Sequence, residues 1–97
     1  MIEVVANSLC VSGPMVIANA AELLDQGRRL LTQSASAGFS KIDLAAVAEV
    51  DSSALSVLFG WLRTARGVRI ELRVINSPAS MLSLASLYGV ADSLPLA

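Results

Sequence analysis

The chain has 97 residues, which is enough for one domain with a single hydrophobic core and too few for two. Seven basic and eight acidic residues leave a net charge of -1, so the sequence lacks the cationic excess that supports nucleic-acid binding. It also has no histidine and only one cysteine, which excludes the usual zinc and iron sites. We therefore expect a single domain over residues 1–97, without nucleic acid, metal or cofactor.

Apolar residues make up 55% of the chain, but glycine, proline and polar residues interrupt the apolar stretches. None of these stretches reaches the roughly 18 residues that a membrane-spanning helix needs. The start of the chain lacks the positively charged flank of a secretory signal. We expect a cytoplasmic protein without direct membrane insertion. Charged residues are 15% of the chain, below the roughly 25% usual in globular domains, which favours a partner that covers part of the apolar surface.

The first third of the chain predicts a β-hairpin followed by a helix. Residues 2–6 alternate in polarity and residues 9–12 form a second β-prone run, which the Gly-Pro pair at 13–14 ends. Asn19, with Glu22 three residues later, resembles a capping box that opens a helix. The predicted helix carries one broad apolar stripe, made of Ala20, Leu23, Leu24, Gly27, Leu30 and Leu31. The small, polar residues 32–40 predict a loop.

The stretch 41–66 organises the rest of the chain. A short apolar strand, predicted from Ile42, Leu44, Val47 and Val50, leads into Asp51, Ser52 and Ser53. These three are residue types that cap helices through a side-chain oxygen. The following helix has an apolar face that we expect to lie on a sheet, made of Leu55, Leu58, Phe59 and Leu62.

A flank of the same helix carries three more apolar residues, Ala54, Val57 and Trp61, at three- and four-residue spacing. One helix face packed on a sheet does not need both sets. The flank therefore either contacts another chain or packs against the rim of a neighbouring helix.

The last third predicts a strand and a helix. Gly67 stops the central helix, and residues 68–74 alternate as in a half-buried strand. Ser77 can cap the next helix, whose inner side is predicted to hold Met81, Leu84, Ala85 and Tyr88. Gly89 ends this helix, and the tail after it is predicted to pack as irregular coil. The order is β-β-α-β-α-β-α, which predicts an α/β fold with helices covering a sheet.

The sequence offers little for catalysis. Without histidine, a nucleophile would need a carboxylate or lysine as its base, and Lys41, the single lysine, has no evident nucleophile beside it. There is no P-loop or GxGxxG pattern, the carboxylates are scattered, and Cys10 is most simply a small core residue. We expect a protein that is not an enzyme.

The Asp51-Ser52-Ser53 turn has two interpretations. It is a helix N-cap, or it is an exposed polar contact point at a helix start. A phosphate there would add roughly two negative charges beside the positive end of a helix dipole, where they are tolerated.

The turn and its surroundings resemble a known family. Residues 42–44 (Ile-Asp-Leu), Val47 and residues 50–55 (Val-Asp-Ser-Ser-Ala-Leu) are similar to the signature of STAS domains, the fold of anti-anti-sigma factors and of MlaB-like subunits of phospholipid-transport ABC complexes. The pattern at 84–95, with Leu84-Ala85, Leu87-Tyr88 and Leu94-Pro95, looks like the end of MlaB-like proteins. The resemblance covers nearly the whole chain.

The resemblance implies an α/β STAS fold of about four strands packed with about three helices, with the Asp51-Ser52-Ser53 turn as its functional corner. In anti-anti-sigma factors the position of Ser53 is the one that an anti-sigma kinase phosphorylates. In MlaB-like proteins the position of Ser52 lies where the subunit contacts the ATPase.

Two departures from the family pattern bear on function. Ala54 stands where many members carry glycine, and alanine is acceptable there because it is the best helix former. Switchable anti-anti-sigma factors commonly carry an acidic residue shortly after the glycine that ends the second strand. Here Gly13 is followed by Pro14, Met15, Val16 and Ile17, which argues against a kinase-regulated switch.

These observations favour a non-enzymatic STAS adaptor that binds and supports the ATPase subunit of an Mla-type ABC complex, which maintains outer-membrane lipid asymmetry, at the inner face of the cytoplasmic membrane. The expected partner-binding residues are Asp51, Ser52, Ser53, Ala54, Val57 and Trp61. The alternative is an anti-anti-sigma factor that is phosphorylated on Ser53 and pairs with an anti-sigma kinase. A third hypothesis, a nucleotide-binding STAS module, rests on the fold alone.

Overall fold

The computed structural model describes residues 1–33 and 38–96. It contains four strands and three helices in the predicted order: β1 (Ile2–Val5), β2 (Ser8–Met15), α1 (Ile17–Gln33), β3 (Lys41–Val50), α2 (Ser52–Gly67), β4 (Arg73–Ile75) and α3 (Ala79–Leu87). A short 3-10 helix, Ala91–Ser93, follows α3. The middle of the loop predicted at 32–40, residues 34–37, lies outside the described residues. The predicted α/β class is confirmed.

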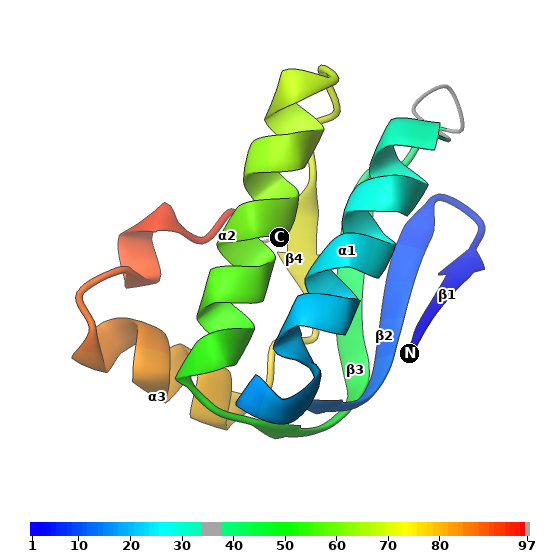
Figure 1. The fold of residues 1–97 in the computed structure, drawn as a ribbon. Coiled ribbons are helices and arrows are strands. Elements are labelled where there is room, and N and C mark those ends of the chain that lie inside the picture. The colour runs from blue at the N-terminus through cyan, green and yellow to red at the C-terminus, as the bar shows by residue number, and fades with distance from the viewer. Residues whose placement is uncertain (34–37, 97) are drawn as a thin grey trace.

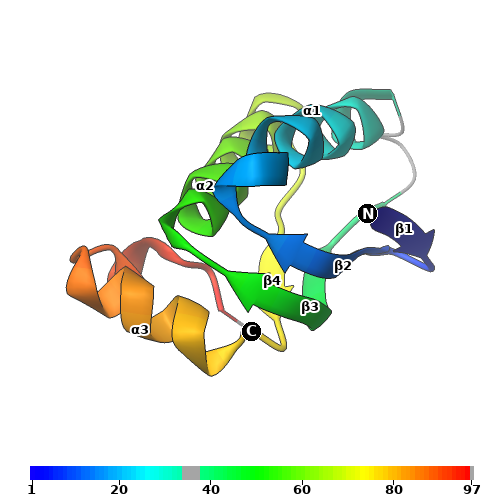
Figure 2. The same cartoon turned by 60° about the horizontal axis from the view of Figure 1, so that its bottom comes forward.

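The four strands form one mixed sheet in the order β1-β2-β3-β4. β1 pairs with β2 antiparallel, whereas β2 with β3 and β3 with β4 are parallel. Helices α1 and α2 lie side by side over one face of this sheet, and α3 lies at the β4 side (Figures 1 and 2). Because β2 and β3 are parallel neighbours, the two helices that follow them begin at the same edge of the sheet.

The core lies between the sheet and the α1–α2 layer. Both layers contribute its fully buried side chains, and α3 adds one: Leu9, Val11, Met15, Ile42, Leu44 and Val74 from the strands, Leu31 from α1, Leu58 and Trp61 from α2, and Met81 from α3. Removing this apolar surface from water is the main stabilisation of such a fold. No helix among the described residues has the length and apolar character needed to span a membrane.

β2 continues past the point where the sequence predicted its end. The Gly-Pro pair at 13–14 lies inside the strand, which runs to Met15. Gly13 adopts a φ of +80°, and the register between β2 and β3 shifts between Gly13 and Pro14. Such an irregularity accommodates a residue without an N–H inside a strand. The prediction that this pair ends the hairpin is therefore wrong.

α1 begins at Ile17, two residues before the predicted capping box. The Asn19 side chain accepts a hydrogen bond from the Val16 amide at 3.0 Å and donates one to the Pro14 carbonyl at 2.8 Å. Asn19 therefore fastens the end of β2 to the helix rather than capping the helix from outside. The predicted apolar stripe is confirmed, because Leu23, Gly27 and Leu31 are buried and Ala20, Leu24 and Leu30 pack against the core.

Of the strand predicted at 68–74, residues 68–69 form a turn, residues 70–72 have no regular secondary structure, and only Arg73–Ile75 forms β4. After Gly67 the chain folds back on α2: the Ile70 amide donates to the Ala65 carbonyl at 2.8 Å and the Arg69 amide to the Arg66 carbonyl at 3.1 Å. Arg69 takes the left-handed conformation, with a φ of +60°. These two bonds are those of a Schellman motif, so this segment satisfies the helix end instead of pairing with β3.

α3 differs from its prediction at both ends. Its N-cap position is Pro78, without a side-chain hydrogen bond, and the buried Ser77 hydroxyl has no hydrogen-bond partner among the described residues. Met81 is buried as predicted, but Tyr88 is 57% exposed. After α3, Leu94 enters the core and Leu96 forms a parallel bridge with Val74, so the tail is more ordered than the predicted coil.

Candidate functional site

The Asp51 carboxylate joins the starts of both long helices. Asp51 is the N-cap of α2, and its Oδ1 accepts a hydrogen bond from the Ser53 amide at 2.8 Å. Its Oδ2 accepts a hydrogen bond from the amide of Ile17, the first residue of α1, at 2.9 Å. One side chain thus satisfies an otherwise free N–H at two helix N-termini, which meet at the lower edge of the sheet in Figure 1. The capping interpretation of Asp51 is confirmed.

These contacts also fix the charge state of Asp51. The hydrogen bond from the Ile17 amide, followed by the one from Ser53, lowers the pKa of the Asp51 carboxyl below its ordinary value. Both bonds favour the charged form, and so do the positive ends of the two helices. Asp51 is therefore ionised at neutral pH and serves as a fixed support for the residues around it.

Ser52 and Ser53 follow this support and differ in exposure. Ser52, the first residue of α2, is exposed, and its hydroxyl makes no hydrogen bond within the described part of the chain. Ser53 is half-buried and is held by its amide. The Ser52 hydroxyl does not cap α2, because Asp51 occupies that role. Ile17, whose amide donates to the same Asp51 carboxylate, is 75% exposed. We call Ile17, Asp51, Ser52 and Ser53 the corner.

A hollow of about 520 Å³ opens next to the corner, between α2 and the end of α3. Its lining combines hydroxyls with apolar and aromatic side chains: Ser52, Ser53, Leu55, Ser56, Phe59, Arg63, Tyr88 and Val90. The exposed ring of Tyr88 and the hydroxyl of Ser56 were missed as site residues from the sequence. The sequence pattern predicts Tyr88 on the inner side of α3. The available signal for its exposure is its position at the end of the helix, directly before Gly89.

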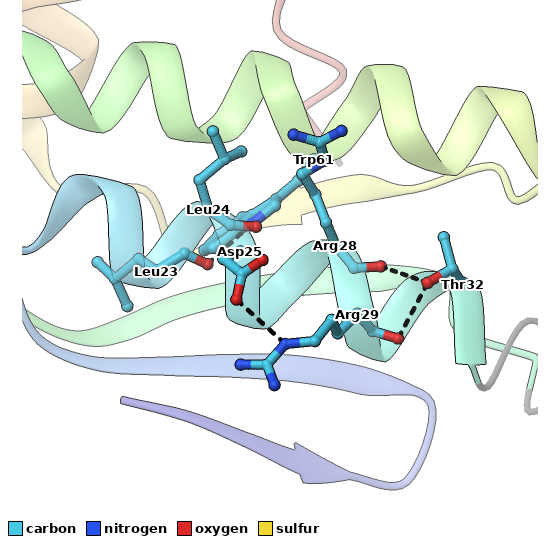
Figure 3. Close-up of polar contacts among 7 residues, drawn as sticks. All are labelled: Leu23, Leu24, Asp25, Arg28, Arg29, Thr32 and Trp61. Carbon is cyan, nitrogen blue, oxygen red and sulfur yellow. Dashed lines mark hydrogen bonds and ion pairs between the residues drawn. The ribbon is translucent and has the colours of Figure 1, made fainter.

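The flank predicted to contact a partner is buried inside the protein. Ala54, Val57 and Trp61 are 1%, 3% and 0% exposed. Trp61 projects from α2 to the backbone of α1, where its Nε1 donates to the carbonyl oxygens of Leu23 and Leu24, both at 3.2 Å (Figure 3). The interpretation of these three side chains as an exposed contact surface is therefore wrong, and for Trp61 the alternative, packing on a neighbouring helix, is correct.

A glycine on α1 makes this packing possible. A Cβ built on Gly27 would overlap the indole ring of Trp61, so the ring occupies the space that any other side chain would fill. Consequently the face of α2 that carries Trp61 is turned toward α1, which the sequence did not predict. Leu55 and Leu58 are buried as expected, whereas Phe59 and Leu62, expected on the sheet, are only half-buried and face the α3 side.

Other reactive groups in the structure have structural surroundings. Burial raises the pKa of the half-buried Cys10 thiol, and Asp43 and Glu3 add to this, so the reactive thiolate is disfavoured. The pKa of Asp43 is lowered by a hydrogen bond from the Asn76 side chain at 3.0 Å and one from the Ala45 amide. Within residues 1–33 and 38–96, no three carboxylate or thiol groups come together in a way that could hold a metal ion.

Comparison with known proteins identifies the architecture. A family model described as "Mlab, STAS domain" matches residues 2–96. No curated protein matches the chain. The structure is similar to that of the unphosphorylated anti-sigma factor antagonist SpoIIAA, with a TM-score of 0.64, 15% identity, and coverage of 90% of this chain and 81% of that one.

A second similar structure is that of a protein from Thermotoga maritima described as a putative anti-sigma factor antagonist. Its TM-score is 0.70 at 16% identity, and the alignment covers 99% of this chain and 83% of that one. At these identities the two structures establish a shared fold and do not transfer a function. The family match covers nearly the whole chain.

Proposed function

The chain belongs to the STAS domain family, and from that premise we propose that it is a non-enzymatic adaptor that binds and supports the ATPase subunit of an Mla-type phospholipid-transport ABC complex. The single observation that carries this proposal is the match of the MlaB-type family model to residues 2–96. Through its partner the protein acts at the inner face of the cytoplasmic membrane, in a system that maintains outer-membrane lipid asymmetry.

The geometry of the corner supports this role. Ser52 presents an exposed hydroxyl at the start of α2, and Ile17 is exposed at the start of α1. Asp51 joins these two helix starts, because it accepts hydrogen bonds from the amides of Ile17 and Ser53. A polar group next to an apolar one on rigid backbone costs little entropy to order on binding. In our proposal Asp51 positions the corner, Ser52 and Ile17 contact the ATPase, and Ser53 supports them.

The corner residues also support a non-catalytic role. The Asp51 carboxylate lies beside the Ser53 side chain, but two backbone amides occupy it and lower its pKa, so it is not the strong general base of a catalytic site. Activation of a hydroxyl nucleophile requires such a base. We therefore propose that the protein acts through its partner's stability or activity and has no turnover of its own.

An anti-anti-sigma function is the second candidate, favoured by the similarity of the fold to anti-sigma factor antagonists. In that function Ser53 would carry the phosphate. The residues after Gly13 weigh against it, because the segment over which Asn19 fastens β2 to α1 contains no carboxylate in this chain.

The deciding experiment is affinity purification of the tagged protein from its native host, with mass spectrometry of the bound proteins and of the intact protein. We expect an ABC-transporter ATPase as the main partner and no added phosphate. Recovery of a serine kinase together with a phosphorylated Ser53 would replace the proposal with the anti-anti-sigma function. Incubation of the purified protein alone with ATP or GTP should give no hydrolysis above background.

A further inference from the structure

The basic side chains of this protein are gathered in one place. Four of the seven, Arg63, Arg66, Arg69 and Arg73, line a groove of about 780 Å³. The groove lies between the C-terminal half of α2, the turn that leads to β4, and the segment after α3, which returns alongside α2 in Figure 1. A chain with a net charge of -1 thus presents a concentrated positive surface.

These arginines are largely without internal partners. Among the described residues, Arg73 pairs with Glu71 at 3.1 Å, and both side chains are more than half exposed, so the pair is weak. Arg63, Arg66 and Arg69 have no ion pair within residues 1–33 and 38–96 and are exposed. Their like charges repel one another in the free protein, and an anionic occupant would relieve that repulsion.

The floor of the groove is apolar. Phe59, Leu62 and Ile70 are half-buried, Leu72 is buried, and Val90 and Pro95 complete the apolar part of the lining. Ser93 and Glu71, the partner of Arg73, also line the groove. Phe59, Arg63 and Val90 also line the hollow at the corner, so the groove continues toward Ser52. An occupant must therefore be elongated and must offer both carboxylate-like groups for the rim and apolar groups for the floor.

The backbone around the groove disfavours a small phosphate ligand. The amides of Arg69 and Ile70 are used in closing α2, and those of Arg73 and Val74 donate to the Ser40 and Pro95 carbonyls. A flat membrane surface would not reach the apolar floor of a concave site.

We propose that this groove, which we call the arginine groove, binds an acidic segment of the protein's partner, in an extended form with apolar side chains between its carboxylates. Arginine forms paired hydrogen bonds with carboxylates, and the apolar side chains cover Phe59, Leu62 and Ile70. This inference rests on the proposed function, because the occupant belongs to the protein partner that contacts the corner.

The test uses the purified full chain and a fluorescent peptide of alternating glutamate and leucine, with binding followed by anisotropy. We expect this peptide to bind, and peptides with glutamine for glutamate or serine for leucine to bind much more weakly. In Arg66→Gln/Arg69→Gln the dissociation constant rises by about two- to fivefold for each guanidinium removed, as expected for exposed ion pairs. Added salt weakens binding, because the charges lie at an exposed rim.

A matched double variant separates the groove from net charge. Arg28→Gln/Arg29→Gln removes the same charge from exposed positions on α1 and should leave peptide binding unchanged. Equal losses in the two double variants, or no binding of the glutamate-leucine peptide, would overturn the inference. Arginine-dependent binding of inorganic phosphate, or of vesicles containing phosphatidylglycerol, without peptide binding would overturn it in favour of those ligands.

The assay contains no ATPase, so the two proposals can fail separately. Absence of peptide binding while an ATPase still co-purifies with the protein removes the groove inference and leaves the proposed function. Arginine-dependent peptide binding without ATPase co-purification supports the groove and removes the ATPase as partner.

Discussion

The two flanks of α2 are both rich in apolar side chains, yet one is closed and the other is open. On the α1 side, Val57 and Trp61 are fully packed and the indole N–H is satisfied by backbone carbonyls. On the α3 side, Phe59 and Leu62 are half-buried and border a groove rimmed by arginines. The difference lies in the neighbouring elements. On the α1 side, Gly27 leaves space for the indole, whereas α3 and the turn after α2 leave the arginine groove open.

An excess of apolar residues on a helix therefore does not by itself locate a partner surface. The closed flank is the more apolar of the two in sequence, and it is core. The open flank mixes Phe59 with Ser56 and Arg63, a combination that is closer to the make-up of protein interfaces, where aromatic residues and arginine are enriched.

The largest effect that tests this comparison is expected at Trp61. Trp61→Ala leaves a large cavity between α1 and α2 and removes the two hydrogen bonds, so we expect a loss of about 3–5 kcal/mol in the free energy of unfolding. Urea denaturation measures it. Tyr88→Ala, on the exposed side, serves as the control and should change stability by about 0.5 kcal/mol or less. A stable Trp61→Ala protein that only loses its partner would return this flank to the contact surface.

A smaller effect is expected from adding one methyl group on each side of the α1–α2 packing. Gly27→Ala forces a Cβ into the Trp61 ring, so we expect destabilisation of about 1–3 kcal/mol although alanine favours helix. Gly60→Ala is the matched control, because its Cβ meets the flexible end of the Leu24 side chain, which can move. We expect Gly60→Ala to be close to neutral in thermal and urea unfolding. Equal tolerance of both would mean that the indole is not tightly enclosed.

At the corner, the contribution of Asp51 to stability is expected to depend on pH. Because the Ile17 and Ser53 amides lower the pKa of Asp51 in the folded state, its stabilising contribution is complete above the ordinary aspartate pKa of about 3.9. It is lost as the pH falls through the lower pKa of the folded protein. Asp51→Asn should therefore lower the melting temperature at neutral pH, and the difference from the wild type should shrink in acid. Asp92→Asn, at an exposed position, is the control, and a pH-independent difference for Asp51→Asn would contradict the assignment.

Much of the fold could be predicted because it depends on local patterns. The element order followed from strand alternation, the α1 stripe and the cap at Asp51, and the family resemblance extended it to the whole chain. Two boundaries could not be predicted in the same way. The passage of β2 through Pro14 depends on a bulge beside β3, and the loss of the strand at 68–72 depends on the bonds that close α2.

The helix cap at the candidate site could be predicted from the sequence, but the long-range contacts around it could not. Asp51 follows a capping pattern, but its second bond, to Ile17, joins residues 34 positions apart and has no sequence signal. The burial of Trp61 depends equally on a distant residue, Gly27. The arginine groove assembles side chains from α2, a turn and β4, which only their spatial arrangement brings together.

The smallest change in stability, and the most informative about function, is expected at Ser52. Its hydroxyl is exposed and unbonded within the described residues, so Ser52→Ala should alter the free energy of unfolding by about 0.5 kcal/mol or less. The same variant should nevertheless impair assembly with the ATPase, measured by co-purification and by transport activity, because the hydroxyl lies in the proposed contact. Ser53→Ala, half-buried and held through its backbone amide, should matter less for assembly. If instead Ser53→Ala and Ser53→Asp have opposite effects on partner binding while Ser52→Ala has none, the corner works as a phosphorylation switch, and the open side of α2 serves a kinase rather than an ATPase.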